Sequence, residues 1–470
     1  MEPLQLFVDK MRLHGIPELV IEQFGQHYTQ LCSGIRSQIP ERTIEPLDEG
    51  LVVPREATSL YYRRGIENLG ATVVIKLNGG LGTTMGLDQP KSLLEVREGK
   101  SFLDCIMGQL RELREQTGVP VPLLFMNSPT TDAPTRRALE SYSGTNPAGI
   151  PQTFQQHLYP RIDAATLLPA HWERAPHLEW NPPGHGDLYS ALATSGLLDT
   201  LIHRGIRYAF VSNCDNLGAL LDPALLGFMD VHQYEFMMEA AVRSPADVKG
   251  GHLALSRETA HLVLREYTQC PESDRGHFVD IARHRFFNTN NLWIDLAALQ
   301  ERFTSNNPLQ LALIVNPKNI DPGDRESLRV LQLETAMGSA VSLFETSCVI
   351  GVGRDRFIPV KSCRDLLAVR SDCYTMKNEC VIEPREGSTP LTLDLDPRYY
   401  ASLNDLALRF PHGVPSLRDA TSLTIRGDVR FGAGVRVCGE VVLDNSDEQH
   451  PRTIPDGTVL SHTTPLPAAP

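Results

Sequence analysis

Apolar residues follow different patterns in different parts of the chain, and the middle part has the clearest one. Between residues 71 and 375, short β-rich runs alternate with helical stretches. The runs predict strands at 71–77 (ATVVIKL), 121–126 (VPLLFM) and 208–213 (YAFVSN), with helices at 101–116 and near 187–205. This alternation predicts an α/β fold in which helices cover a mixed, mostly parallel sheet.

The amino-terminal part has a helical stripe in place of this alternation. Its apolar positions are Leu6, Met11, Leu13, Leu19, Ile21 and Phe24, and the stretch IPERTIEPLDEG then interrupts them with proline and glycine. The stripe predicts an N-terminal helical segment at residues 1–70.

The carboxy-terminal part repeats an apolar residue every six positions. The repeat runs through Leu423, Val429, Val435 and Val441, and Val459 returns to the same phase after an insertion. A six-residue period with glycines between the strands is typical of a β-helix, although an ordinary hairpin pair with coincidental spacing is the alternative. We therefore expect a main domain at 71–375, a helical linker at 376–415 and a small β-helix domain at 416–470.

Composition narrows the class of protein. The 470 residues predict two or three domains, and 44 basic against 57 acidic residues give a net charge of -13. This charge disfavours nonspecific binding to nucleic acid or to an anionic membrane. The sequence shows no signal peptide, no run long enough to span a membrane, and nine scattered cysteines without a CxxC pair. We expect a cytoplasmic protein with reduced thiols.

A glycine-rich loop follows the first predicted strand. It contains Gly79, Gly80, Gly82 and Gly86, and glycine lets backbone N–H groups approach a phosphate closely. A dinucleotide fingerprint fails because Met85 stands where its third glycine belongs. The GKS at 99–101 is no better, because a Walker loop would need a glycine at position 94, which is a leucine.

A lysine follows this loop and completes a phosphate site. Pro90 fixes the backbone before Lys91, whose ammonium can then neutralise phosphate charge. Asp215 comes just after the strand at 208–213, where open α/β sheets place their ligands, so its carboxylate can hold Mg2+. An ordinary turn with Asn216 is the alternative for this aspartate.

The loop and lysine resemble the signature of the eukaryotic-type UTP–glucose-1-phosphate uridylyltransferases, also called UDP-glucose pyrophosphorylases. Further family-like stretches follow in order: MNS at 126–128, FQQHLYPRI at 154–162, PPGHGDLY at 182–189, FVSNCDNLGA at 210–219, ADVKGG at 246–251, FNTNNLW at 287–293, LQLETA at 331–336 and FIPVKSCRDLL at 357–367. So many motifs in the same order make a chance match implausible.

The resemblance implies a fold and an activity. The fold would be a Rossmann-like, GT-A-like nucleotidyltransferase domain at 71–375 with a C-terminal left-handed β-helix. The reaction would be UTP plus glucose 1-phosphate giving UDP-glucose plus pyrophosphate, with Mg2+ as cofactor. The resemblance also implies that copies of the chain associate as a homo-oligomer through the C-terminal domain, although the proline-rich end TTPLPAAP is unsuited to adding a further apolar coil.

The resemblance also implies roles for individual residues. The catalytic residues would be Lys91, Lys361 and Asp215, with Asp215 as the metal ligand. The nucleotide would contact Leu77, Asn78, Gly79, Gly80, Lys91, Met126, Gln156, Gly184, Asp215 and Lys361. The sugar phosphate would contact His185, Asn213, Lys249, Asn290 and Asn291. For the uracil amide, the neighbouring Gln155 is the alternative to Gln156, and Met126 could instead be plain core.

Two other functions fit parts of this pattern. One is a uridylyltransferase for another sugar 1-phosphate, such as galactose or an N-acetylhexosamine. The other is a noncatalytic nucleotide-sugar-binding scaffold on the same fold. Retention of Lys91, Asp215 and Lys361 disfavours the scaffold, because a protein that only binds has no need of groups that assist the departure of pyrophosphate.

Overall fold

The computed structural model of the chain describes residues 3–34, 37–142, 146–147, 149–304, 309–387, 391–445 and 450–461. The predicted C-terminal domain at 416–470 therefore lies partly outside the described residues, and its TTPLPAAP end lies wholly outside them. The α-helices are α1 Pro3–Leu13, α2 Glu18–Cys32, α3 Tyr62–Asn68, α4 Phe102–Thr117, α5 Pro129–Leu139, α6 Leu188–Thr194, α7 Leu197–His203, α8 Pro223–His232, α9 Arg275–Val279, α10 Leu296–Thr304, α11 Cys363–Arg370, α12 Pro397–Tyr400 and α13 Leu403–Arg409.

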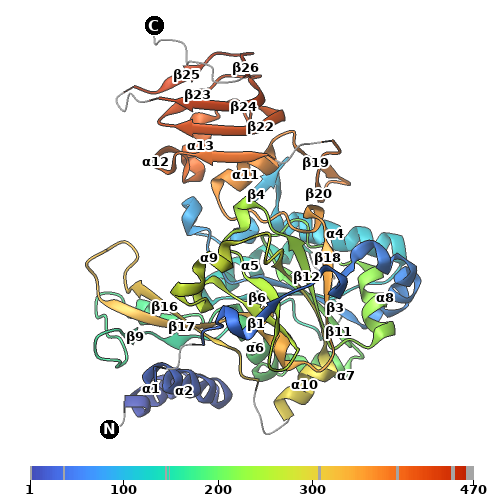
Figure 1. Ribbon diagram of the computed structural model, residues 1–470, viewed down its shortest axis with the longest axis vertical. Coiled ribbons are helices and arrows are strands. Elements are labelled where there is room, and N and C mark those ends of the chain that lie inside the picture. The colour runs from blue at the N-terminus through green and yellow to red at the C-terminus, as the bar shows by residue number, and fades with distance from the viewer. Residues whose placement is uncertain are drawn as a thin grey trace.

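An 11-stranded sheet forms the centre of the molecule (Figure 1). Its strand order is β2-β18-β12-β15-β11-β3-β6-β7, with β1, β13 and β14 attached beside β15. Strand β15 runs antiparallel to both of its neighbours in this order, and all other pairs along the order are parallel. The expectation of an α/β fold with a mixed, mostly parallel sheet is confirmed.

The strands of this sheet have the following bounds: β1 Ile44–Pro46, β2 Val52–Pro54, β3 Thr72–Asn78, β6 Leu123–Asn127, β7 Thr153–Gln155, β11 Tyr208–Asn213, β12 Phe236–Val242, β13 His252–Ser256, β14 Leu262–Arg265, β15 Phe286–Asp295 and β18 Ser347–Val352. Small sheets lie beside it: β4 Glu95–Arg97 with β5 Lys100–Ser101; β8 Tyr159–Pro160 with β10 Trp180–Asn181; β9 Ile162–Asp163 with β16 Leu313–Asn319 and β17 Arg329–Thr335; and β19 Tyr374–Lys377 with β20 Val381–Pro384.

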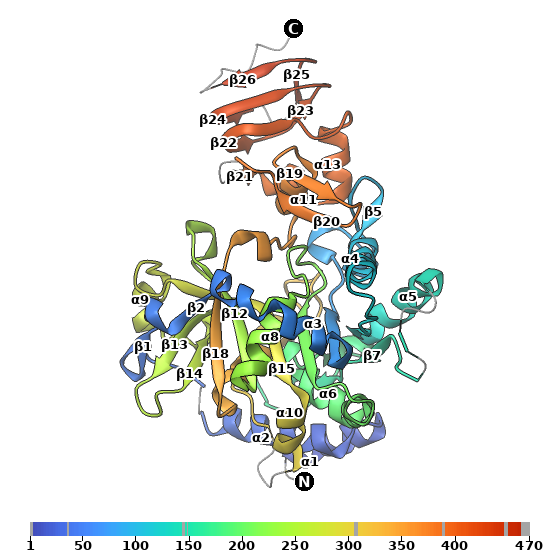
Figure 2. The same ribbon diagram turned by 90° about the vertical axis from the view of Figure 1, so that its right-hand side faces the viewer.

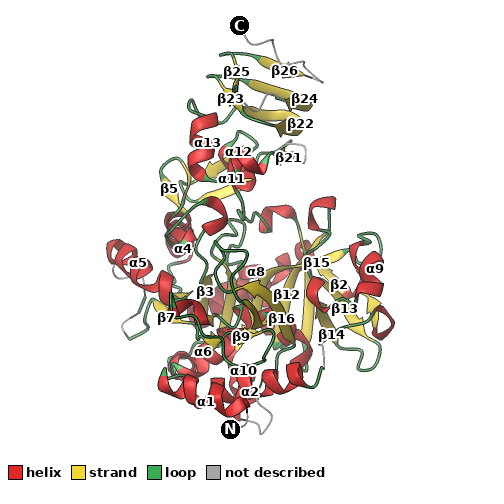
Figure 3. Cartoon of the chain, turned by 90° about the vertical axis from the view of Figure 1, so that its left-hand side faces the viewer, coloured by secondary structure: helices red, strands yellow, loops and turns green. Residues whose placement is uncertain are grey.

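Helices cover both faces of the central sheet, as Figures 2 and 3 show. On one face, α6, α7 and α10 bury the odd-numbered positions of β3, such as Val73 and Ile75. On the other face, α4 and α8 pack against Val74 together with Phe210 and Trp293. Because β3 is buried on both faces, it has the continuous apolar character of a central parallel strand, with Lys76 as its one charged residue.

The predicted strands at 71–77, 121–126 and 208–213 are confirmed as β3, β6 and β11. The single helix expected near 187–205 is wrong, because the chain forms α6 and α7 with a break between them. Gly196 caps the second helix with φ +69°, a left-handed conformation that ends one helix before the next begins.

The first seventy residues are not all helical. Helices α1 and α2 pack through Phe7 and Phe24 against the small sheets that contain β8 and β17. Strands β1 and β2, however, pair with β13 and β18 of the central sheet. The domain boundaries at 70, 375 and 415 stay predictions.

The C-terminal strands stand at the opposite end of the molecule from α1 and α2 (Figure 1). They form two small parallel sheets: β21 Thr392–Leu395, β22 Ser416–Arg426, β24 Arg436–Asp444 and β26 Val459–Ser461 in one, and β23 Val429–Phe431 with β25 Arg452–Ile454 in the other. Leu423, Val429, Val435 and Val441 are all buried, as the six-residue period predicts. Val459 is 56% exposed and Leu460 is buried in its place, because the insertion shifts the phase by one residue.

No described helix is both long and apolar enough to cross a membrane.

A buried histidine pair beside the central sheet makes stability depend on pH. The rings of His252 and His284 stack with centroids 3.8 Å apart, and neither nitrogen of His252 has a hydrogen-bond partner in the described structure. Burial lowers the pKa of both histidines. The unfolded chain therefore binds more protons below pH ~6.5, and the free energy of unfolding falls as pH falls through that value.

We expect the substitution His252→Phe to reduce this loss by up to about 1.4 kcal/mol per pH unit, because phenylalanine keeps the stacking and cannot be protonated. Urea unfolding at a series of pH values between 7 and 5 measures the slope. The exposed His203 offers a control in His203→Phe, which should leave the slope unchanged. An unaltered slope in His252→Phe would contradict this assignment.

Candidate active site

The glycine-rich loop leaves the carboxyl end of β3 and folds back on itself. Leu81 forms an isolated antiparallel bridge with Pro90, and the backbone N–H of Lys91 donates to the carbonyl of Gly80 over 3.4 Å. A Cβ atom on Gly79 would lie 2.7 Å from the amide nitrogen of Gln156. Only glycine therefore lets this amide lie directly against the start of the loop.

Lys91 meets Asp215 at the same edge of the sheet. The Lys91 Nζ atom donates to Asp215 Oδ2 over 2.7 Å, and the two side chains are only 13% and 15% exposed. The contact follows from the fold, because β3 and β11 are parallel neighbours whose ends, Leu77 and Asn213, are in register. The second carboxylate oxygen, Asp215 Oδ1, is buried and makes no hydrogen bond within the described structure.

The segment before Lys361 is tied to the turn that carries Asp215. The N–H of Val360 donates to the carbonyl of Asp215 over 3.0 Å, and the N–H of Ile358 donates to Asn216 Oδ1 over 2.9 Å. Lys361 itself is exposed, and its ammonium makes no hydrogen bond or ion pair in the part of the chain that the structure describes. These bonds hold the backbone just before Lys361 next to the Asp215 turn, and they leave the lysine ammonium available to a ligand.

A cleft of about 640 Å³ opens next to this edge. Its volume lies within the range of roughly 300–1,000 Å³ that is usual for small-molecule sites. Five of the residues expected to bind the substrates line this cleft: Gly184, His185, Lys249, Asn290 and Lys361. The cleft therefore gathers side chains from distant parts of the sequence at one place.

His185 faces this cleft as a neutral imidazole. The N–H of Met337 donates to His185 Nδ1 over 3.0 Å, so the ring proton belongs on Nε2. Burial, together with a smaller contribution from the charge of Lys361, lowers the pKa of His185 to about 4. His185 can therefore donate one hydrogen bond at neutral pH without adding a positive charge.

A known protein family matches this chain over most of its length. The family model for UTP–glucose-1-phosphate uridylyltransferase matches residues 21–437. The chain belongs to this family.

Its relatives match over most of their length. The chain is 40% identical over 427 residues to UTP–glucose-1-phosphate uridylyltransferase from Astragalus penduliflorus, covering 90% of this chain and 86% of the relative. It is 42% identical over 397 residues to the protein of that name from Hordeum vulgare, covering 84% of this chain and 81% of the relative. The family match at residues 21–437 includes the central sheet and the cleft.

Solved structures share the whole architecture. A mutant UDP-glucose pyrophosphorylase from Leishmania major in complex with UDP-glucose superposes with a TM-score of 0.92 at 39% identity, covering 99% of this chain and 100% of the other. The UDP-glucose phosphorylase from Trypanosoma brucei gives 0.89 at 40% identity, covering 98% of each chain. These solved structures therefore share the fold of this chain over 98–99% of its length.

The structure separates two asparagines that the family motif NTNN places side by side. Asn290 has φ +61° at an irregularity in the pairing of β12 with β15, and it lines the cleft. Asn291 is fully buried, where its amide donates to Glu239 and to the carbonyl of Arg356 and accepts from Asn216. The sugar contact expected of Asn291 finds no support in this geometry, because its polar atoms are already bonded inside the protein.

The buried network around Asn291 supports the site from behind. Glu239 accepts from the Arg356 guanidinium, from Asn291 and from the indole N–H of Trp293 over 3.0 Å. Arg356 in turn donates to the carbonyl of Leu220 over 2.7 Å. The network thereby connects strands β12 and β15 to two segments of the site. One is the turn that carries Asp215, and the other is the segment that precedes Lys361.

Several residues expected to contact the nucleotide are buried. Leu77 and Met126 are 8% and 1% exposed within the main core, and the Asn78 amide donates to Asn127 over 2.8 Å and to Thr135 over 2.9 Å. Asn78 is itself fully buried, with its side-chain amide already bonded inside the protein. Their nucleotide roles stay predictions, with the core alternative for Met126 favoured by its burial.

The two neighbouring glutamines are distinguished by their contacts. Gln155 points away from the loop and donates to Asp132 Oδ2 over 2.8 Å. Gln156 lies against Gly79, and its backbone N–H donates to the carbonyl of Asn127 over 2.8 Å. Gln156 is therefore the amide of the pair that lies at the glycine-rich loop.

Sequence reasoning missed an acidic residue of the cleft, Glu266. A Cβ atom on Gly251 would lie 2.6 Å from the Glu266 carboxylate. Burial raises the pKa of Glu266, and the charge of Lys361 opposes that shift. No local motif surrounds Glu266, and only the pairing of β13 with β14 brings it to Gly251. A carboxylate in this position can accept hydrogen bonds from sugar hydroxyls.

Proposed function

We propose that this chain catalyses the reversible reaction of UTP with glucose 1-phosphate to give UDP-glucose and pyrophosphate. Family membership supports the reaction class, and one observation carries the assignment to this chain. Lys91 and Asp215 meet under the glycine-rich loop, and the segment tied to Asp215 through Val360 leads directly to Lys361, which lines the cleft. A noncatalytic scaffold would have no use for this arrangement of groups around a leaving pyrophosphate.

The reaction needs no general base. A phosphate oxygen of glucose 1-phosphate is already an anion, and it attacks the α-phosphorus of UTP as the bond to pyrophosphate breaks. The remaining task is to align two polyanions and to offset the charge on the transferred and leaving groups. Lys91, Lys361 and the loop N–H groups supply positive charge and donors for that purpose.

A magnesium ion fits the donor set at Asp215. The orphaned Asp215 Oδ1 is a hard oxygen ligand, and the described residues hold no cluster of three or more metal-binding side chains. Mg2+ commonly takes one or two carboxylates and completes its coordination with phosphates and water. Bound there, the ion would neutralise triphosphate charge, and Asp215 would hold it.

Gln156 and the backbone of Gly184 would contact the uracil end of the nucleotide. An amide both donates and accepts, which matches the edge of uracil. Gly184 has φ +81°, and a Cβ there would lie 2.5 Å from the carbonyl of Thr335. The turn can therefore present its backbone at close range only with glycine.

We expect Gln156→Ala to raise KM for UTP by about tenfold, because a buried hydrogen bond to the base is worth roughly 1–3 kcal/mol. Gln155→Ala is the matched control, and KM for UTP should stay within about twofold of the unmodified protein, a few tenths of a kcal/mol. Initial rates at varied UTP measure both. A larger effect from Gln155→Ala would reverse the assignment.

The sugar phosphate would lie across the cleft. His185, Asn213, Lys249 and Asn290 are four of the five expected contacts, and we add Glu266 in place of the buried Asn291. The proton on His185 Nε2 and the exposed Lys249, whose Nζ lies 5.8 Å from the centre of the Tyr267 ring, supply donors to the sugar phosphate. Formation of UDP-glucose from UTP and glucose 1-phosphate, followed by mass spectrometry, tests the proposal, and absence of the product would overturn it.

We also propose the finer architecture that the resemblance implies. The sheet at 71–375 would be a GT-A-like catalytic domain, linked through 376–415 to a short left-handed β-helix. The parallel pairing of Leu423 with Val441, three six-residue steps later, supports a coil with three sides. Self-association through this end of the molecule stays a prediction.

A further inference from the structure

A lysine stands in the middle of the most buried strand of the sheet. Every residue of β3 is buried, and Lys76 is only 2% exposed, on the face where Val74 and Phe210 form part of the core. Withdrawing an ammonium from water is costly, and the side chain forms no ion pair in the described structure. Burial lowers the pKa of Lys76 to about 7. Stability alone would favour an apolar residue here.

The contacts of Lys76 join the two ends of one turn. Its Nζ atom donates to Ser212 Oγ over 2.7 Å and to the carbonyl of Ala219 over 2.9 Å. It also lies 5.7 Å from the centre of the Phe210 ring. Ser212 is near the end of β11 and Ala219 follows the turn, so Lys76 spans the segment 213–218 that carries Asp215.

We propose that Lys76 is a positioning residue, which holds the 213–218 turn closed so that Asp215 stays against Lys91. This inference rests on the proposed function and assigns no contact between Lys76 and substrate. An ammonium suits the task because it has three donors, and here two of them hold opposite ends of the turn. A methionine would fill the same volume without holding either end.

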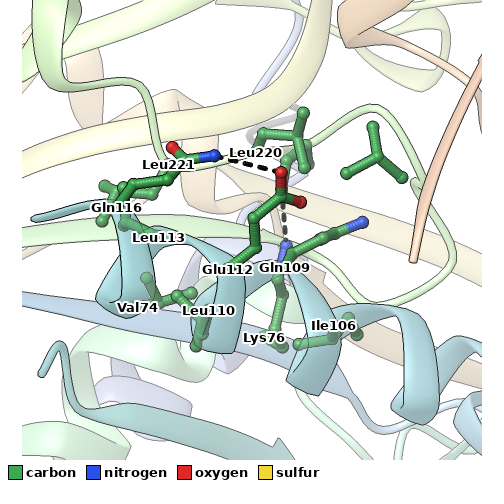
Figure 4. A pocket seen from close by; sticks show the side chains of 12 residues that line it. Val74, Lys76, Ile106, Gln109, Leu110, Glu112, Leu113, Gln116, Leu220 and Leu221 are labelled. Carbon is green, nitrogen blue, oxygen red and sulfur yellow. Dashed lines mark hydrogen bonds between the residues drawn. The ribbon is translucent and has the colours of Figure 1, made fainter. Parts of the chain in front are cut away.

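A small, partly open cavity is lined by Lys76, and Figure 4 shows the side chains around it. It has a volume of about 200 Å³ and lies between α4 and residues 219–221. Its walls are largely apolar, and at its edge Gln116 donates to Glu112 over 3.0 Å. A short alkylamine can therefore reach the place that the Lys76 side chain occupies, which makes chemical rescue possible.

The test compares Lys76→Met, Lys76→Ala and Ser212→Ala by turnover, Mg2+ titration and thermal unfolding. Lys76→Met should keep the melting temperature, lower kcat at least tenfold and raise the Mg2+ concentration for half-maximal rate severalfold, with KM for glucose 1-phosphate unchanged. Ser212→Ala should show the same changes to a smaller degree, because the bond to Ala219 remains.

Chemical rescue separates positioning from a purely structural role. Adding propylamine or butylamine to Lys76→Ala should restore turnover in a saturable manner, whereas butanol, which has the same chain and no charge, should not. A folded Lys76→Met with unchanged kcat and Mg2+ dependence would overturn the proposal, and so would a folded Lys76→Ala that amines do not rescue. Activity of the unmodified protein, measured alongside, shows whether the proposed function itself holds.

Discussion

Replacing Lys91 by alanine is expected to lower turnover by roughly a hundred- to a thousandfold, the usual effect of removing one charged or polar donor from a preorganised site. The ammonium lies under the glycine-rich loop and contacts Asp215 over 2.7 Å. Because the site acts by offsetting charge on two polyanions, no neighbouring group replaces it at the same point. Steady-state release of pyrophosphate from UTP and glucose 1-phosphate measures the loss.

Lys100 offers a matched control for this substitution. It belongs to the GKS stretch that resembles the tail of a Walker loop, and it forms a surface ion pair with Glu379 over 3.5 Å. Lys100→Ala should keep turnover within about twofold, since exposed ion pairs contribute little. Near-normal turnover in a folded Lys91→Ala would refute the role of the loop and its lysine.

Asp215→Asn should raise the Mg2+ concentration needed for half-maximal rate by at least about tenfold, because a neutral amide oxygen is a much poorer ligand than a carboxylate for a hard cation. The substitution keeps the size of the side chain and an oxygen that can accept from Lys91. It therefore changes charge with little change in packing. Initial rates over a wide range of Mg2+ concentration show the shift.

Asp199 supplies the control for the second substitution. It lies on α7, away from the cleft, and accepts a hydrogen bond from Gln300 over 2.6 Å. Asp199→Asn should leave the magnesium titration unchanged. An unchanged titration in Asp215→Asn would instead remove Asp215 from the metal site.

The sequence predicted the parts of the site that are local. The loop after β3, its lysine and the aspartate after β11 each follow a recognisable strand, and neighbouring parallel strands end at one edge of a sheet. The contact between Lys91 and Asp215 follows from that rule. The choice between Gln155 and Gln156 could not be predicted from that rule, because it depends on which amide faces Gly79 after the chain leaves β7.

Contacts that depend on tertiary packing escaped prediction. Asn290 and Asn291 are chemically alike in the motif, yet one lines the cleft and the other bonds to Glu239 inside the protein. Side chains alternate along a strand, so Asn291 shares the buried face of Trp293. Glu266 belongs to no motif. Val459 continues the six-residue count, but it is exposed, because the length of the insertion before it does not reveal which residue is buried next.

The most direct test of the central claim is release of pyrophosphate from UTP and Mg2+ with a panel of sugar 1-phosphates. The account predicts that glucose 1-phosphate gives the highest kcat/KM, and that ATP or CTP in place of UTP supports little reaction. A higher kcat/KM with galactose 1-phosphate or an N-acetylhexosamine 1-phosphate would contradict the sugar assignment. No release with any sugar would contradict the enzymatic function as a whole.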